Sequence, residues 1–449
     1  MNQNEMKQII SDAAAKAGIN EYELYFEEAQ GTDVTIFERE VKEFSSEEVA
    51  GVCFRCLTGN NIGYASTELF TEDELAALPA RALENAKLIE SGDAQPFYKA
   101  GDTYRPVVLQ SRSPLASSSD YIHTAMEAQE AAYAADDRIT TGTETSCGGV
   151  RKKIWLFNSN GLDFSADYGY DVLVSGPVAR DGEESTDGMT FAYGKLSELD
   201  AKNIAKTAVS RAVSKLHAKQ QTSGQMPVVF SGEQMCTILS AFLSVFSADA
   251  AQKGLSLLSG KENETIASPC VTLIDDPFYK DSPVQMSFDA EGVATFTKPV
   301  IENGVLKTLL HNRKTAQKAG VASTANGAKH SYADAVSISP YCFYLQPGDA
   351  SFDTLIDGIE SGVYITALKG LHAGANAITG DFSIDSEGFT IENGKLGGAV
   401  RSFTVAGNFF DLLKNIRGFD NAFYLDYPSG VTVLGSADAL VDGLTIAGK

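Results

Sequence analysis

The beginning of the chain shows one helical pattern followed by several strand patterns. Apolar residues recur at helical spacing between Ile9 and Ala17, so residues 3–18 are predicted to form an amphipathic helix that ends at Gly18. Runs of β-branched and aromatic residues then predict strands at 22–28, 33–44, 50–57 and 62–66. We expect an antiparallel meander behind one helix.

The next part of the chain alternates between helical and strand patterns. Residues 72–91 and 120–136 are predicted helices, and the Pro-, Ser- and Gly-rich stretch between them, 91–119, is predicted to be a long loop that serves as a lid or an interface. Strand patterns return at 139–178, with a hairpin turn at 158–161.

One more helix closes this half. Ser197 is its expected N-cap, Asp200 lies in its first turn, and basic residues at 215–219 suit its C-terminus. Polar residues and a glycine at 220–224 then break the pattern, so a domain boundary is predicted at about residue 222.

The second half opens with an apolar strand at 227–230 and a helix. Ser231 is the expected N-cap, and Gln234 stands three residues later, as in a capping box. The predicted apolar stripe of this helix consists of Met235, Ile238, Leu239, Phe242 and Phe246.

Beyond that helix, strands and glycine turns dominate, apart from short helices around Thr315 and at 352–359. The predicted fold class is α+β with two domains. Residues 1–222 form a helix-plus-antiparallel-sheet domain, and residues 223–449 form a β-rich domain.

Composition narrows the functional classes. The 449 residues carry a formal net charge of −23, which repels the phosphate backbone, so nucleic-acid binding is not expected. The chain has no apolar run long enough for a membrane span and no secretory signal in its first 18 residues, and its 6 Cys are scattered. We therefore expect a cytoplasmic protein without membrane contact.

The histidines and cysteines give no local metal motif. The second half contains His311, His330 and His372 without metal-ligand spacing, although their convergence in the fold stays open. Cys53 and Cys56 lie in a strand pattern, where residues three apart point to opposite faces, which opposes a shared metal or redox role. Packing is likewise the interpretation for Cys236, Cys270 and Cys342.

Other chemistry is equally hard to assign from the residues alone. The sequence contains neither a Gly-x-Ser-x-Gly elbow nor a Walker loop. Acidic residues at Asp275, Asp276, Asp289 and Glu291 are suited to acid–base catalysis or Ca²⁺ binding, but solvated turns are the preferred interpretation.

Several blocks in the second half, taken in order, resemble the TldD/TldE (PmbA) family, whose members are sometimes labelled modulators of DNA gyrase. The blocks include Pro-Val-Val-Phe at 227–230, Leu-Leu-Ser-Gly at 257–260, Leu-Ile-Asp-Asp-Pro at 273–277, Phe-Asp-Ala-Glu-Gly-Val at 288–293, Ile-Glu-Asn-Gly-Val-Leu at 301–306, Gly-Asp-Phe-Ser at 380–383, Ile-Glu-Asn-Gly at 391–394 and Val-Ala-Gly-Asn at 405–408. The meander at 51–67 is also similar to the family. Within these blocks, the candidates for peptide or interface contacts are Asp381, Ser383 and Asn408.

The resemblance implies a metalloprotease system in which the TldD-type subunit carries His-Glu-x-x-x-His on the helix after the Pro-Val-Val strand, with a Cys near its C-terminus. The matching positions in this chain are Leu239, Ser240, Ala241, Ser244 and Val245. None of these side chains is a usual zinc ligand. This chain therefore resembles the TldE (PmbA) side, with no cofactor of its own and zinc in the partner.

The implied function is that of a non-catalytic subunit that pairs with a TldD-type catalytic subunit, or with a second copy, and acts on unfolded peptides. The segment 326–332 resembles the TldD side more closely, which marks a divergent member. Two alternatives stay open. The first is a stand-alone metallopeptidase with a relocated metal site, and the second is a regulatory protein that contacts gyrase.

Overall fold

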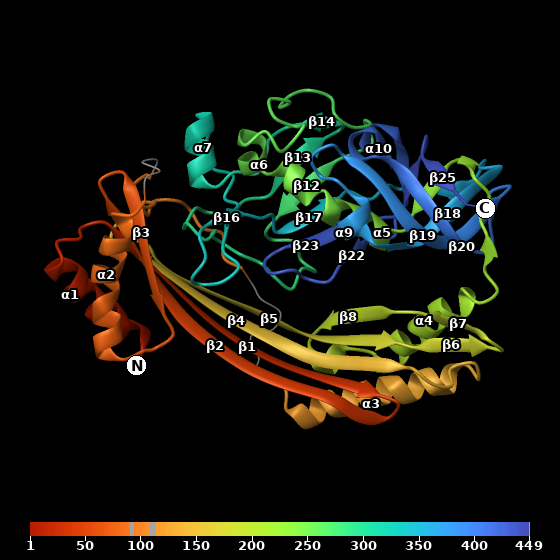
Figure 1. The fold of residues 1–449 in the computed structure, drawn as a ribbon, viewed down its shortest axis with the longest axis horizontal. Coiled ribbons are helices and arrows are strands. Elements are labelled where there is room, and N and C mark those ends of the chain that lie inside the picture. Colours follow the sequence, from red (N-terminus) through yellow and green to blue (C-terminus); the bar gives the residue numbers. More distant parts are fainter. Residues whose placement is uncertain (90–93, 108–113, 449) are drawn as a thin grey trace.

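The computed structural model describes residues 1–89, 94–107 and 114–448. In the N-terminal half, six of the described strands form one antiparallel sheet (Figure 1). Its order is β3 (Asn61–Thr67), β2 (Glu40–Thr58), β1 (Tyr22–Phe37), β4 (Glu144–Asn158), β5 (Asp163–Gly176) and β8 (Thr190–Gly194). The expected α+β class and the hairpin turn at 158–161 are confirmed.

The strands β1 and β2 are longer and fewer than the sequence pattern suggested. Three separate strands were predicted at 22–28, 33–44 and 50–57, whereas two continuous strands are observed. The residues between the predicted strands also take part in the strand pairing. For example, Ala29 of β1 pairs with Val49 of β2 on one side and with Lys152 of β4 on the other. The chain reverses at Glu38 and Arg39, whose φ angles of 49° and 68° suit a tight hairpin turn.

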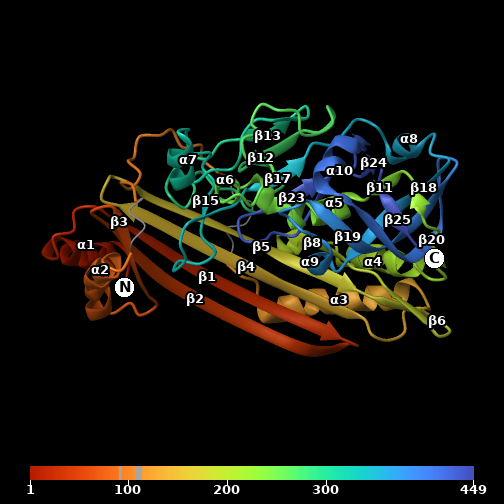
Figure 2. The same cartoon turned by 45° about the horizontal axis from the view of Figure 1, so that its top comes forward.

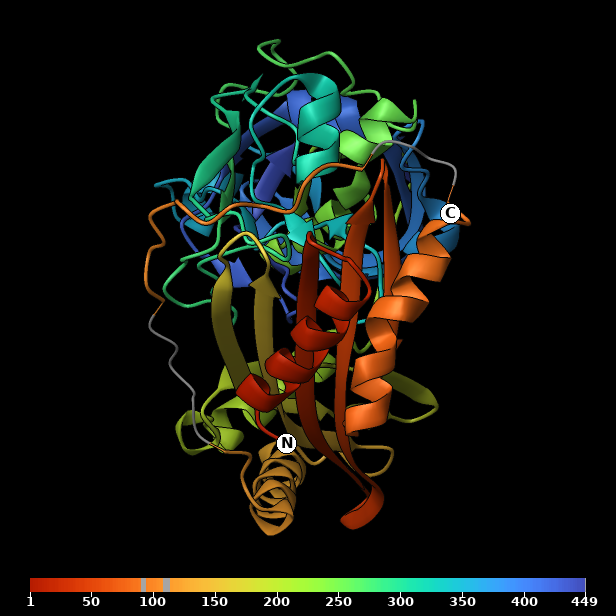
Figure 3. The same ribbon diagram turned by 90° about the vertical axis from the view of Figure 1, so that its left-hand side faces the viewer.

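Helices cover the outer face of this sheet (Figure 3). At one end, α1 (Gln3–Lys16) and α2 (Glu72–Ala86) bury apolar residues against β1 and β2. At the other end lie α3 (Ser118–Ala135) and α4 (Ala201–Ser214). The expected N-cap Ser197 is wrong: it lies in a 3-10 turn, Leu196–Glu198, and Asp200 caps α4 by accepting a hydrogen bond from the Asn203 N–H at 3.0 Å.

The long loop predicted at 91–119 is only partly described. Residues 94–107 and 114–117 contain no helix or strand, and residues 90–93 and 108–113 lie outside the described residues. The strands β6 (Val178–Asp181) and β7 (Glu184–Asp187) form a separate small hairpin.

The C-terminal half contains two larger sheets. The first has the order β10 (Gly224–Gln225), β25 (Thr445–Ala447), β20 (Lys395–Asn408), β19 (Asp381–Glu392), β18 (Ser361–Lys369), β11 (Val228–Phe230), β24 (Ala439–Val441) and β21 (Ile416–Phe419), with β9 (Lys219–Gln220) also paired to β20. The second has the order β14 (Val305–Leu306), β13 (Lys298–Glu302), β12 (Leu273–Asp276), β17 (Cys342–Leu345), β23 (Val433–Ser436) and β22 (Tyr424–Leu425). A short pair joins β15 (Gly327–Ala328) to β16 (Ser337–Ile338).

Several short helices accompany these sheets. Those expected around Thr315 and at 352–359 are observed as α7 (Arg313–Ala319) and α8 (Phe352–Ile356). The sequence pattern missed three others, α6 (Ala248–Gln252), α9 (Leu371–Gly374) and α10 (Phe409–Asn415). Each is much shorter than the window of about 11–18 residues over which apolar periodicity becomes visible, which explains why the pattern did not indicate them.

The helix α5 (Gly232–Ala241) packs in the core between the two C-terminal sheets. Ser231 caps it as expected, since its hydroxyl accepts a hydrogen bond from the Gln234 N–H at 3.3 Å. The predicted apolar stripe is buried, but the α-helix stops at Ala241 and a 3-10 turn, Leu243–Phe246, follows. Phe242 stacks on Phe409 at 4.5 Å between ring centroids, which fixes the end of α5 against α10.

The C-terminal half lies over the long N-terminal sheet (Figure 2) and contacts it at one end and again farther along. At one end, apolar residues of β1, β4 and β5 form a cluster with Val284, Met286, Phe288 and Tyr341. At that end Tyr332 also lies directly over Gly51, where a side chain would collide with its ring. Farther along the sheet, Tyr170 of β5 and Phe191 of β8 meet the Tyr427 ring at 6.0 and 5.8 Å. The division at residue 222 stays a prediction, although β9 already pairs with a C-terminal strand.

We expect Phe242→Ala to lower the free energy of unfolding by about 3–5 kcal/mol, because it leaves a cavity beside Phe409 in the core around α5. The matched control is Phe44→Ala, since Phe44 is 52% exposed and its removal should cost about 0.5 kcal/mol or less. Urea unfolding followed by circular dichroism measures both variants. Equal losses would contradict the assigned role of Phe242.

Candidate functional site

A cleft of about 570 Å³ separates α4 from the start of α5 and from β18. Its walls include Arg211 on α4, Glu233 and Thr237 on α5, and Tyr364 and Lys369 on β18. The cleft thus lies where the N-terminal half faces the C-terminal half, a common position for binding sites.

One face of α5 points into this cleft. Glu233 and Thr237, which are four residues apart, line it, and Ser240 continues the same face one turn later. The opposite face is buried in the core, so the sequence of α5 divides cleanly into packing residues and accessible residues.

The five positions taken from the family resemblance fall into two groups. Leu239 and Val245 are buried in the core, and Ala241 packs against it. Ser240 and Ser244 are exposed. The accessible side chains on this part of the chain are therefore hydroxyl groups.

The strand β18 presents an open edge to the same cleft. Its neighbour β11 pairs only with Val363, Tyr364 and Ile365. Among the described residues no strand continues this pairing from Thr366 to Lys369, and this stretch lines the cleft. An extended peptide can add to such an edge through main-chain hydrogen bonds.

Ion pairs hold the two walls of the cleft together. Arg211 Nη1 of α4 lies 2.8 Å from Glu233 Oε2 of α5. On the other side, Glu387 of β19 approaches Lys369 at 2.6 Å and Lys215 at 3.8 Å. Because these groups are partly exposed, each pair contributes only about 0.2–1 kcal/mol and orients the walls more than it stabilises them.

A carboxylate lies at the beginning of α5, inside the cleft. The Gly232 N–H donates to Asp438 Oδ1 at 2.7 Å. Burial raises the pKa of Asp438 to about 6, and the hydrogen bonds from Gly232 and Tyr364 only partly offset this rise. Asp438 thus lines the cleft with a carboxyl whose pKa is raised by burial, a common feature of functional sites.

The three peptide or interface candidates lie together, next to the cleft helix rather than in the cleft. Asp381 and Asn408 are cross-strand partners on β19 and β20, and the Asn408 side-chain amide donates to Asp381 Oδ1 at 2.9 Å. Ser383 is exposed two residues later. Between them Phe382 turns inward and meets Phe242 at 6.3 Å, which links this surface to the end of α5. Their functional role stays a prediction.

The histidines of the second half do not converge. His311 is buried and lies within 3.2 Å of the Thr315 hydroxyl, whereas His330 and His372 are exposed on other segments. Within residues 1–89, 94–107 and 114–448, no group of three or more His, Cys, Asp or Glu side chains is placed to hold a metal ion.

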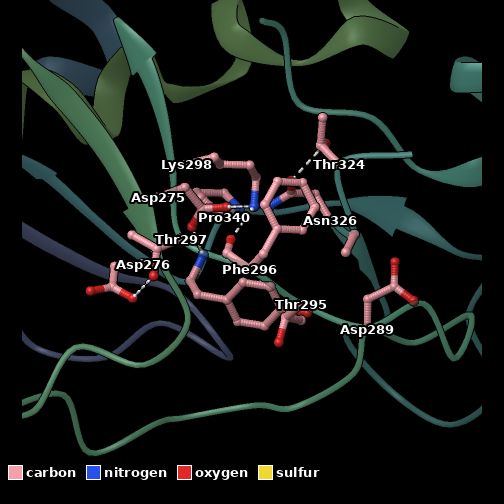
Figure 4. A network of polar contacts seen from close by, with 12 residues as sticks. Asp275, Asp276, Asp289, Thr295, Phe296, Thr297, Lys298, Thr324, Asn326 and Pro340 are labelled. Carbon is pink, nitrogen blue, oxygen red and sulfur yellow. Dashed lines mark hydrogen bonds and ion pairs between the residues drawn. The ribbon is translucent and has the colours of Figure 1, made fainter. Parts of the chain in front are cut away.

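The acidic residues expected in solvated turns are largely buried, so that interpretation is wrong. Asp275 is fully buried between Lys298 Nζ at 2.8 Å and the Asn326 side-chain amide at 2.7 Å (Figure 4). Asp289, to one side of this network, accepts hydrogen bonds from the N–H groups of Glu291, Val293 and Gly327. Burial and the nearby Glu291 raise the pKa of Asp289.

The burial of the Asp275 and Asp289 carboxylates has a structural explanation. A buried carboxylate needs hydrogen-bond donors, and here distant segments supply them, which a local pattern cannot show. Asn326, which opens the segment that resembles the TldD side, bonds Asp275 and the Ser339 carbonyl. The segment therefore has a packing role of its own.

The cysteines follow the packing interpretation with one exception. Cys53 and Cys56 are buried, and Cys56 lies in the cluster under α1 and α2 on the outer face. Cys236 and Cys342 are buried as well, but Cys270 is exposed, because it stands in a turn before β12 rather than inside a strand.

Three family models match the chain. They are the PmbA/TldA metallopeptidase domain 1 at residues 22–86, the central domain at 113–216 and the C-terminal domain at 223–448. The chain belongs to the PmbA/TldD metallopeptidase family. The first two models share the single N-terminal sheet, since β1 pairs with both β2 and β4.

Relatives named after TldD and relatives named after PmbA are both similar to this chain. A metalloprotease of Methanothermobacter thermautotrophicus is 30% identical over 86% of this chain and 84% of its own. In Haemophilus influenzae, a metalloprotease TldD homologue is 26% identical over 94% of this chain and 90% of its own. A metalloprotease PmbA homologue of the same organism is 25% identical over 92% of this chain and 91% of its own. Overall identity therefore does not separate the two types.

Solved structures agree with the family fold. A proposed modulator of a DNA gyrase from Thermotoga maritima superposes with a TM-score of 0.90 at 29% identity and covers 99% of this chain and 100% of its own. TldE from Thermococcus kodakarensis, at 22% identity and a TM-score of 0.88, covers 98% and 99% and supports the fold alone. No described helix is long and apolar enough to cross a membrane.

Sequence reasoning missed most of the cleft in this PmbA/TldD chain. Arg211, Tyr364 and Asp438 come from three distant segments and belong to no local motif. The signal that was available is Ser231, whose capping role places Gly232 beside Asp438.

We expect Asp438→Asn to change how stability depends on pH. The folded pKa of Asp438, about 6, exceeds the usual unfolded value of about 3.9. The folded state therefore binds the proton more tightly, and this contribution is present at low pH and is lost as pH rises from about 4 to 6. Asn keeps the acceptor for Gly232 but cannot ionise.

The measurement is the difference in unfolding free energy between the variant and the wild type, determined at pH 4 and pH 7. Between pH 4 and pH 7, the stability of Asp438→Asn relative to the wild type should increase by about 2–3 kcal/mol, because the wild type loses the contribution of its protonated carboxyl. A difference that stays constant would show that Asp438 titrates normally.

Proposed function

We propose that this chain is the zinc-lacking, non-catalytic subunit of a TldD/TldE-type metalloprotease complex that acts on unfolded peptides. The observation that carries the proposal is the accessible face of α5. Glu233 and Thr237 on this face line the cleft between the halves, and the exposed residues among the positions that the family resemblance matches to metal ligands are Ser240 and Ser244.

The residues present do not fit a zinc ion. Zinc sites in proteins use thiolate, imidazole and carboxylate ligands, and hydroxyl groups of Ser and Thr are rarely among them. Glu233, the carboxylate on this face, is paired with Arg211. Because the face of α5 lacks an ordinary ligand set, we assign no catalytic step to this chain.

The surrounding scaffold is that of the family. The cap at Ser231, the buried stripe of α5 and the Phe242–Phe409 stack keep the helix in place without a metal. These features support a subunit that retains the shape of the site as part of a larger assembly.

Peptide holding is the role that the cleft supports best for this chain. The open edge of β18 from Thr366 to Lys369 lies beside the accessible face of α5. An unfolded peptide has free main-chain groups and can pair with such an edge, whereas a folded protein cannot. The partner would be a TldD-type subunit with its own zinc ion, and a cytoplasmic location stays a prediction.

The alternative of a relocated metal site has less support. It needs at least three ligands that converge, and no described group provides them. The gyrase alternative rests on the name given to the Thermotoga maritima relative.

We expect the purified chain to bind no stoichiometric zinc after dialysis, as measured by elemental analysis. The double variant Thr237→His with Ser240→His serves as a positive control. It places two imidazoles one turn apart on the accessible face of α5 and should raise zinc affinity above that of the wild type. About one tightly held zinc per wild-type chain would favour the relocated-site alternative.

We further expect peptide cleavage only when this chain is combined with a TldD-type subunit. Replacing the Glu of the partner's motif by Gln should lower kcat by at least about 100-fold, because that carboxylate acts as the general base. Ser244→Ala in this chain should leave the chemical step intact. Chelator-sensitive cleavage by this chain alone, with contaminating protease excluded, would overturn the assignment.

A further inference from the structure

The strand β2 has a free edge over much of its length. Its residues 52–58 pair with β3, but among the described residues no strand pairs with 40–51 on the side away from β1. Residues 40–49 are all exposed, and Figure 2 shows β2 along the outer margin of the sheet, away from the C-terminal half. Alternate residues of such an edge point their main-chain N–H and C=O groups into solvent.

Cross-strand pairing sorts the side chains of this edge by face. Phe44 pairs with Val34, which packs against α3, so Phe44 stands on the outer face of the sheet. A register shift brings Val41 to the same face, and these two side chains are 52% and 46% exposed. Glu43 and Glu47 stand on the opposite face, because neighbouring residues of a strand alternate. One face of the edge is therefore apolar and the other is acidic.

The carboxylates of the acidic face lack a counter-charge. Neither Glu43 nor Glu47 forms an ion pair within residues 1–89, 94–107 and 114–448. Lys42, the cation of this segment, lies 2.9 Å from Glu144 of β4 and is neutralised there. Partial burial and the charge of Glu43 raise the pKa of Asp33 on the adjacent strand β1. The acidic face thus carries negative charge that a partner can neutralise.

A second copy of the chain fits this edge poorly. Antiparallel pairing of two copies about Ser45 places Glu43 of each copy opposite Glu47 of the other. Like charges directly opposite each other destabilise a sheet. Other registers also gather the carboxylates of both copies along one shared edge. The charge therefore favours a strand of opposite sign from a different chain.

We propose that residues 40–51 of β2 form a docking surface for a strand of another protein chain that carries Lys or Arg at alternate positions and apolar residues between them. Its basic side chains face Glu43 and Glu47, its apolar side chains cover Phe44 and Val41, and main-chain hydrogen bonds join the two strands. This surface shares no residue with the cleft, so the inference goes beyond the proposed function and does not depend on it.

The test uses a fluorescently labelled peptide of about 12 residues that alternates Val and Lys, together with the full chain. Fluorescence anisotropy at pH 7 and physiological ionic strength should show saturable binding by the wild type. A peptide that alternates Val and Glu should bind at least about tenfold more weakly, because its charges oppose those of the edge. This comparison uses the wild type alone and does not depend on the folding of a variant.

A pair of variants locates the contact. Glu43→Lys with Glu47→Lys should weaken binding of the Val–Lys peptide at least about tenfold, because two attractive contacts become repulsive. Glu262→Lys with Glu360→Lys makes the same change in net charge at exposed positions of the C-terminal half, and should change the affinity by less than about twofold.

Hydrogen–deuterium exchange tests the main-chain contact. Bound Val–Lys peptide should slow amide exchange within residues 40–51, whose outward N–H groups gain acceptors. Exchange within residues 52–58 should stay unchanged, because β1 and β3 already pair with this part of β2 on both sides.

Each remaining outcome counts against the proposal. No saturation up to about 1 mM Val–Lys peptide would overturn it and leave the glutamates as charges that only keep the edge from aggregating. Equal weakening by both double variants, or protection elsewhere than in residues 40–51, would show general charge attraction. A wild-type dimer that Glu43→Lys with Glu47→Lys dissociates, as measured by sedimentation, would replace the foreign strand by a second copy.

Discussion

The burial of one face of α5 between two sheets is the constraint on which the rest of the C-terminal half depends. Residues of β11, β18 and β23 pack around this helix, and Phe242 joins its end to α10 and β19. A core of this kind tolerates little change in volume. The accessible face carries no such restriction. Packing therefore fixes where α5 lies but leaves the chemistry of its accessible face free to vary.

The N-terminal sheet places a second wall opposite that face. Its length follows from β1 and β2, which stay paired over their polar middle sections. An apolar cluster around Phe288 at one end and an aromatic group around Tyr427 farther along fix the sheet against the C-terminal half. The cleft lies next to this aromatic group, because Tyr424 contacts Phe191 and also lines the cleft, and the Arg211–Glu233 ion pair joins its walls.

The sequence predicted elements whose signals are local. The Ser231 cap, the stripe of α5 and the turn at 158–161 all depend on residues a few positions apart, and all are observed. Predictions failed where distant residues decide the outcome. Asp275 is buried because Lys298 and Asn326 neutralise and bond it, and the cleft around Asp438 is assembled from segments that are far apart in the sequence. No local pattern carries that information.

The separation between packing and accessible residues means that the position of α5 does not depend on which side chains its accessible face carries. If a metal ion held α5 in place, loss of the ligands would cost folding energy, as it does in structural zinc sites. Here the apolar stripe and the aromatic stack supply the stability, and Thr237 and Ser240 take no part in the core. Selection on such a chain would then act on the shape of the cleft and on the open edge of β18. Under the proposed function, these two features are the ones that a peptide-binding subunit needs.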